Sequence, residues 1–199
     1  MSTPTKRERT RSHVARTAHS LFERNGFEAV TMEQIAAEAG VARGTLYNHF
    51  PVKEAVLIEW MHAQLGEDLG PLMAEVMARP TFTARLAMLL ESSARWWERH
   101  RQYAAPYVRF RFQQVRDAQS SALSDMATAY TELIAHAQGR GEIRNDEPAH
   151  RLAGYLHFLY LYALLSWIED GDLSLAEELG RACEFFMRGA RLPRGRRRT

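Results

Sequence analysis

The chain has 199 residues, of which 46% are hydrophobic and 25% are charged. This composition is typical of a globular protein that can bury a hydrophobic core, and it excludes low-complexity and collagen-like chains. The lone cysteine, Cys183, excludes an internal disulfide and a cysteine-based zinc site, and it favours a reducing compartment such as the cytoplasm. No apolar run of signal-peptide length follows the basic N-terminal residues, so we expect no signal peptide.

The net charge of +2 is distributed unevenly along the chain. Residues 1–53 carry +3, residues 54–187 carry −7, and residues 188–199 hold six arginines and no acidic residue. A basic N-terminal part on an acidic body is expected when only that part meets a polyanion. A basic tail is often just a solvated end, and residues 191–199 are expected to be disordered.

The spacing of apolar residues predicts an all-α protein, because they recur every three or four positions and strand-like alternation is rare. Helices are expected over 6–24, 31–39, 42–49, 53–69, 82–100, 104–115, 119–138, 146–169 and 174–189. Gly70 and Pro71 are expected to kink or end the helix that begins at Lys53. Asp146 and Ser174 are the predicted starts of the last two helices.

Residues 31–50, TMEQIAAEAGVARGTLYNHF, have the spacing of a helix-turn-helix. Thr31 and Gln34 have capping-box spacing, and Gly40 lies in the turn between the two helices. The side chains expected on the exposed side of the second helix are Arg43, Thr45, Tyr47, Asn48 and His49. Core packing explains so polar a helix poorly, whereas insertion into a DNA major groove explains it well.

This segment resembles the TetR family of bacterial regulators. The shared motifs are Leu21-Phe22, Gly26-Phe27, Thr31-Met32, Ile35-Ala36, Ala39-Gly40-Val41, Gly44 through Phe50 and Lys53-Glu54. The resemblance covers roughly residues 10–58, and beyond them it lies mainly in the helical layout. It implies a three-helix DNA-binding domain with a basic N-terminal arm at 1–52 and a helical effector-binding and dimerisation domain at 53–190, which the basic tail at 191–199 follows.

The resemblance also implies which residues contact DNA. Phosphate contacts are expected from Thr31, Tyr47, His49 and Lys53. The residues expected to reach or approach base edges are Arg43, Thr45 and Gly44, and Asn48 completes the DNA-binding set. The alternatives are a core aromatic at Tyr47 and a merely solubilising charge at Arg43. The basic residues expected to reach DNA from the arm are Lys6, Arg7, Arg9 and Arg11.

The run 152–168 carries no full charge and has the minimum length of a membrane span. It contains His157 and three tyrosines, and no second span accompanies it, so we expect a buried helix and no membrane partner. In the TetR family the last two helices of each subunit form a four-helix bundle with those of its partner. The expected homodimer interface consists of Leu156, Leu164, Trp167, Leu175, Leu179, Cys183 and Phe186.

Residues 60–130 are rich in methionine and aromatic side chains, which are common in ligand pockets. The resemblance implies an effector pocket here, for a small hydrophobic or aromatic molecule. The expected lining is Trp60, Met61, Trp96, Tyr103, Tyr107, Phe110 and Tyr130. The alternative for each of these residues is a place in the hydrophobic core without a contact to any ligand.

The sequence shows no HExxH motif, no glycine-rich phosphate loop and no nucleophile motif, so we expect no enzyme, no cofactor and no metal. The predicted function is a cytoplasmic transcription regulator, favoured to be a repressor, that a small-molecule effector releases from palindromic double-stranded operator DNA. Two alternatives remain: a ligand-independent regulator controlled by a protein partner, and a helical enzyme.

Overall fold

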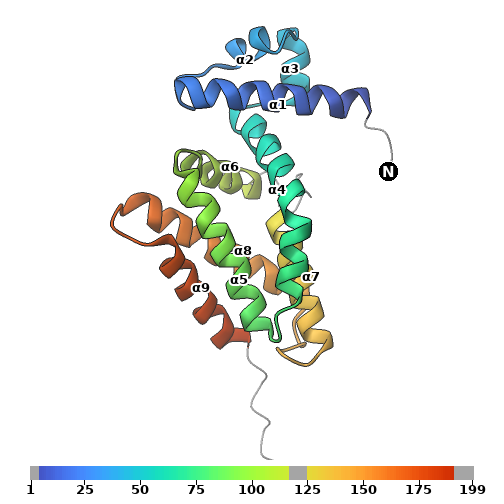
Figure 1. Cartoon of the computed structure of the whole chain (residues 1–199), viewed down its shortest axis with the longest axis vertical. Coiled ribbons are helices and arrows are strands. Elements are labelled where there is room, and N and C mark those ends of the chain that lie inside the picture. The colour runs from blue at the N-terminus through green and yellow to red at the C-terminus, as the bar shows by residue number, and fades with distance from the viewer. Residues whose placement is uncertain (1–4, 117–124, 191–199) are drawn as a thin grey trace, which may run out of the picture. The chain divides into compact units, whose positions relative to one another are not determined.

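The computed structural model describes residues 5–116 and 125–190, and over these ranges the protein is helical without strands, as the sequence predicts (Figure 1). The elements are α1 (Lys6–Asn25), α2 (Met32–Glu38), α3 (Arg43–His49), α4 (Lys53–Met77), α5 (Phe82–Arg99), the 3₁₀ turn η1 (Arg101–Tyr103), α6 (Ala104–Arg116), α7 (Asp125–Gly139), α8 (Ala149–Glu169) and α9 (Leu175–Ala190). The expected tail at 191–199 lies outside the described residues, as does the predicted start of the helix at 119.

The chain divides into two compact units. The first comprises residues 1–70 and 105–113, so it holds α1–α3, most of α4 and most of α6. The second comprises residues 71–104 and 114–199 and holds α5, α7, α8 and α9. A compact unit is not the same as a functional domain, so the domain boundaries expected at residues 52 and 190 stay predictions.

Local capping explains where the first helices begin and end. The Thr31 hydroxyl accepts a hydrogen bond from the Gln34 N–H at 3.2 Å, and the Gln34 side chain accepts one from the Thr31 N–H at 2.8 Å. This reciprocal pair is the capping box that the sequence predicts at the start of α2. Gly40 adopts φ +63°, a conformation that glycine takes without a steric penalty, and so turns the chain from α2 into α3.

Helix α4 does not end at the glycine–proline pair. The helix continues through Gly70 and Pro71 to Met77, so of the two expected outcomes, a kink or an end, the end is wrong. Proline removes one backbone donor from a helix and crowds the preceding turn. The segment that follows Pro71, LMAEVM, consists largely of good helix formers, and these carry the helix onward.

The second unit is built around α9, which packs against both α5 and α8, while α8 also packs against α7. In its core the Tyr160 hydroxyl accepts a hydrogen bond from the Trp97 indole at 2.5 Å and lies 2.8 Å from the Ser93 hydroxyl. Burial raises the pKa of the Cys183 thiol on α9. Over residues 5–116 and 125–190, no helix combines the length and the apolar character needed to span a membrane.

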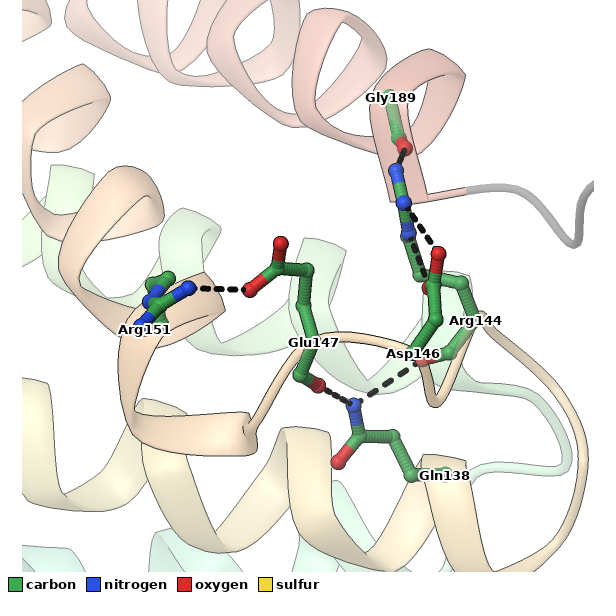
Figure 2. A network of polar contacts seen from close by, with 6 residues as sticks. All are labelled: Gln138, Arg144, Asp146, Glu147, Arg151 and Gly189. Atoms are coloured by element: carbon green, nitrogen blue, oxygen red, sulfur yellow. Dashed lines mark hydrogen bonds and ion pairs between the residues drawn. The ribbon is translucent and has the colours of Figure 1, made fainter.

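The loop between α7 and α8 is fixed by a polar network (Figure 2). The Arg144 guanidinium donates to both carboxylate oxygens of Asp146, at 2.6 Å each, and to the Gly189 carbonyl at 3.3 Å. The Gln138 amide donates to the carbonyls of Arg144 and Glu147. Because Arg144 donates to it, the pKa of Asp146 lies below its ordinary value.

The same network corrects the predicted start of α8. Asp146 is committed to Arg144, and α8 begins three residues later, at Ala149 after Pro148, without a side-chain cap. The other predicted start is closer, because the Ser174 hydroxyl accepts from the Glu177 N–H at 3.4 Å and α9 begins at Leu175.

A nearly buried ion pair joins this loop to α5. Arg85 on α5 is 3% exposed, and its guanidinium donates to Glu142 at 3.0 Å. The other Glu142 oxygen accepts from the Phe82 N–H in the first turn of α5. Burial raises the pKa of Glu142, but the bonds from Arg85, Phe82 and Arg140 outweigh this effect and leave the pKa below its ordinary value of 4.5.

We expect Glu142→Gln to lower the free energy of unfolding at pH 7 by roughly 1–3 kcal/mol, because it leaves the buried Arg85 cation without its carboxylate. A lowered carboxylate pKa stabilises the fold above the ordinary value, and this contribution is lost as the pH falls through the folded-state pKa. The difference between wild type and variant should therefore shrink below about pH 4.5. Denaturant unfolding from pH 7 to pH 3.5 measures this difference in the free energy of unfolding. A difference that does not change with pH would contradict the ion pair between Arg85 and Glu142.

Candidate nucleic-acid interface

Helix α3 presents almost all of its surface to solvent. Within its seven residues, all of which the structure describes, Leu46 alone is buried, at 0% exposure. Leu46 is one of the buried side chains of the first unit, as are Val14 of α1 and Ile35 of α2, and α3 packs against α2. The exposed residues are Arg43, Gly44, Thr45, Tyr47 and Asn48, and His49 is half-buried. Tyr47 is 44% exposed, so it is not the core aromatic of the alternative interpretation.

One carboxylate of α2 holds two side chains of this exposed face. Glu33 Oε1 accepts hydrogen bonds from Arg43 Nη2 and from the Tyr47 hydroxyl, the latter at 3.3 Å. The pKa of Glu33 lies below its ordinary value, first because its own backbone N–H donates to it, and Arg43 and Tyr47 add to the effect. Sequence analysis missed Glu33, since only the folded turn at Gly40 brings it beside residues ten and fourteen positions later.

Lys53 is occupied by the protein itself. Its ammonium donates to the carbonyls of Phe27 at 2.6 Å, Val30 at 2.9 Å and Glu28 at 3.2 Å, and it lies 4.4 Å from the centroid of the Phe27 ring. An ammonium group has three N–H donors, and these contacts use all of them. The side chain therefore joins the loop between α1 and α2 to the start of α4, and these contacts argue against the phosphate contact expected of Lys53.

The basic N-terminal residues do not form a free arm either. From Lys6 onward they lie in α1, after a capping box made by Thr5 and Glu8. Arg11 donates to the His49 carbonyl at 2.8 Å, pairs with Glu59 and lies over the Phe50 ring at 4.4 Å. Arg11 thus ties α1 to the end of α3 and to α4, while Lys6, Arg7 and Arg9 remain exposed.

The residues expected to line an effector pocket fall into both compact units. Trp60, Met61, Tyr107 and Phe110 belong to the first, and Trp96, Tyr103 and Tyr130 belong to the second. Phe110 and Trp96 are half-buried and the other five are buried. In the first unit Arg111 of α6 is 7% exposed, with its guanidinium 3.3 Å from the His62 ring nitrogen of α4. Helices α4 and α6 thus meet in the unit that carries α3.

The residues expected at the dimer interface are already buried within one chain. Leu156, Leu164, Trp167, Leu175, Leu179, Cys183 and Phe186 are each at most 7% exposed, because they face the core between α5, α8 and α9. Their burial within one chain argues against direct contact with a second copy. The exposed large apolar side chains of these two helices are Tyr155, Phe158, Tyr162 and Phe185, at 57%, 46%, 65% and 70%. Their spacing on α8, every three or four residues, was available in the sequence.

A groove of about 580 Å³ adjoins these exposed aromatic residues. Its walls are largely apolar side chains of α8 and α9, and Arg144 and Glu147 also line it. None of the seven expected effector residues lines it. Among the described residues, no group of three or more His, Cys, Asp or Glu side chains is placed to hold a metal ion.

Two short helices, α2 and α3, joined by the turn at Gly40, with an exposed polar surface on the second, have the arrangement of a helix-turn-helix DNA-binding protein. Residues 15–60 match the family model of the bacterial regulatory proteins of the tetR family. A protein assigned as the mycofactocin biosynthesis transcriptional regulator MftR of Mycobacterium tuberculosis is 30% identical over 196 residues, or 95% of this chain and 94% of that protein. The regulator UidR of Escherichia coli K12 is 27% identical over 175 residues, or 85% of this chain and 87% of UidR.

A solved structure extends the similarity to the whole fold. FadR of Thermus thermophilus, a TetR family transcriptional repressor crystallised with lauroyl-CoA, is 27% identical, with a TM-score of 0.76 over 95% of this chain and 99% of its own. The chain belongs to the TetR family of bacterial transcription regulators. These relatives are regulators rather than enzymes.

The contacts of Lys53 predict a structural rather than an electrostatic defect on substitution. Lys53→Ala should lower the free energy of unfolding by about 1–3 kcal/mol, because three carbonyls lose a charged donor. The dependence of DNA affinity on salt should keep its slope. Lys6→Ala, a change at an exposed lysine, is the matched control and should leave the melting temperature unchanged. A wild-type melt together with a slope reduced by about one for Lys53→Ala would restore the phosphate contact.

Proposed function

We propose that this chain represses transcription in the cytoplasm by binding a palindromic operator as a homodimer, and that a small-molecule effector releases it. The observation that carries the DNA-binding part is α3, in which one buried leucine anchors a helix whose other side chains remain available to a major groove. A repressor needs no further chemistry at the promoter, because occupying the operator excludes the polymerase.

For the DNA contacts we propose that Arg43 and Thr45 meet base edges, with Gly44 allowing close approach of the backbone. Their exposure on α3 supports this assignment. Thr31, Asn48 and His49 are proposed to contact the phosphate backbone and to set the position of α3 in the groove. The single O–H of Tyr47 is donated to Glu33, so Tyr47 is assigned to hold that carboxylate rather than a phosphate. Lys53 has no place in this set, because its three donors bind carbonyls within the protein.

For the effector we propose an acyl thioester of coenzyme A or a similar amphipathic molecule. The support is the similarity to the Thermus thermophilus FadR, which was crystallised with lauroyl-CoA. Within the first unit, the buried Trp60, Met61 and Tyr107 and the half-buried Phe110 fit an apolar chain. Helix α6 belongs to the same compact unit as α3, so a ligand that displaces α6 would act on the DNA-binding helices through their shared packing.

For the dimer we propose that the exposed face of α8 and α9 meets the same face of a second copy. Tyr155, Phe158 and Tyr162 repeat along one side of α8, and Phe185 extends this apolar surface onto α9. A contiguous set of exposed aromatic side chains marks an interaction surface. A two-fold axis would make the interface self-complementary and would present two copies of α3 to the two half-sites of a palindrome.

Selection of bound sequences from random DNA, followed by release from the selected operator, tests the function. We expect a palindrome whose half-site centres are about one helical turn apart. Lauroyl-CoA should weaken operator binding by roughly 5- to 150-fold, the usual range of allosteric coupling, whereas coenzyme A alone should not. Operator binding that responds to neither molecule would leave the regulator standing and refute the acyl thioester.

Adjacent residues of α9 provide a matched test of the dimer face. Phe185→Glu should give a folded monomer with lost operator binding, because a charge replaces a side chain that is 70% exposed in the single chain. Phe186→Glu should instead lower the free energy of unfolding, since Phe186 is 5% exposed and the loss of a buried phenylalanine costs about 3–5 kcal/mol. Sedimentation and thermal melts separate the two effects. A dimeric Phe185→Glu variant would refute this interface.

A further inference from the structure

We propose that Glu33 is a positioning residue for base recognition: its carboxylate fixes Arg43 and Tyr47 and remains paired with them on DNA. The proposal rests on the role given to Arg43 above. It concerns an acidic residue on a surface that faces a polyanion, where an isolated negative charge would weaken binding.

The geometry allows one carboxylate to orient two side chains of α3. Glu33 lies in the first turn of α2, and its Oε1 accepts from Arg43 Nη2 and from the Tyr47 hydroxyl. Arg43 and Tyr47 are four residues apart and therefore lie on one side of α3. The Glu33 carboxylate of α2 thus links two successive turns of α3, the recognition helix.

The bond to Glu33 leaves Arg43 able to contact a base. A guanidinium has five N–H donors, and the Glu33 bond uses one of them. The remaining donors suffice for the bidentate contact with guanine O6 and N7, the commonest specific contact of arginine in the major groove. A long, exposed arginine otherwise samples many rotamers, so a fixed carboxylate reduces the entropy lost when it binds the base.

Charge also favours a pair that persists on DNA. If Arg43 left Glu33 to bind a base, the carboxylate would face the phosphates without its cation, and the complex would be weakened. While the pair is intact, Arg43 cancels that charge and the Tyr47 hydroxyl solvates it. The low pKa of Glu33 keeps the carboxylate ionised at neutral pH.

A second glutamate on α2 offers a matched control. Glu38 pairs with Arg24 at 2.9 Å, and the two glutamates are similarly exposed, at 50% for Glu38 and 45% for Glu33. The two arginines are also exposed, at 57% for Arg24 and 69% for Arg43. Removal of either glutamate deletes one negative charge from α2 and one exposed ion pair. Arg24 lies in α1, however, so only the Glu33 pair involves the recognition helix.

The test compares base preferences after selection from random DNA for the wild type, Glu33→Ala, Glu38→Ala, Arg43→Ala and the double variant Glu33→Ala/Arg43→Ala. We expect Glu33→Ala to reduce discrimination about two- to five-fold, at the same half-site position at which Arg43→Ala abolishes it. The double variant should lose no more than Arg43→Ala alone. Glu33→Gln, whose amide oxygen can still accept from Arg43, should restore part of the preference. Glu38→Ala should change affinity for all sequences equally.

Each other outcome overturns a defined part of the argument. If Glu33→Ala keeps the wild-type preferences and gains affinity for all DNA as Glu38→Ala does, Glu33 contributes only its charge. If it sharpens the preference and tightens operator binding, Glu33 competes with DNA for Arg43. If Arg43→Ala itself leaves every position unchanged, both the role of Arg43 and the positioning by Glu33 fail. Thermal melts should match the wild type for the glutamate variants, since both side chains are exposed.

Discussion

The DNA-binding part of the protein depends on how α3, a helix of seven residues, is held in place. A helix this short is not stable in water by itself, because it has too few hydrogen bonds to offset the cost of nucleation. Leu46 supplies its only buried side chain within the described fold, and Arg11 holds its end by binding the His49 carbonyl. Since so little of α3 is used for packing, nearly all of its surface remains for recognition. Because so few contacts hold α3, its orientation is sensitive to the helices that it packs against.

Two basic side chains that the sequence predicts to contact DNA, Lys53 and Arg11, join helices within the protein in this structure. Lys53 binds three carbonyls of the loop between α1 and α2, and Arg11 binds a carbonyl, a carboxylate and an aromatic face. Such contacts fix the entry of α4 relative to the three N-terminal helices. Part of the positive charge of the N-terminal region is thus used to build the DNA-binding surface, and the rest remains free to attract DNA.

Local signals in the sequence predicted most of the fold, and tertiary contacts decided the rest. The capping box at Thr31 and the glycine turn at Gly40 depend on neighbours within three residues, and both were predictable. The roles of Lys53 and Asp146 depend on which partner the fold brings near, and a sequence pattern does not contain that information. For the interface, periodicity identified α8 and α9 correctly as apolar helices but could not tell which side faces the subunit core. Both sides carry aromatic residues, because Tyr160, Trp167 and Phe186 are buried while Tyr155, Phe158, Tyr162 and Phe185 are exposed.

The buried thiol has a practical consequence for measuring the motion of this regulator. Cys183 is the sole cysteine of the sequence, it is 7% exposed, and its raised pKa disfavours the reactive thiolate. A cysteine introduced at an exposed site, such as Asn48 on α3, would therefore react with a maleimide probe ahead of the native thiol. Spin or fluorescent labels could then be attached without first removing the natural cysteine. In the proposed homodimer, the distance between the two labels would report how far apart the two copies of α3 stand.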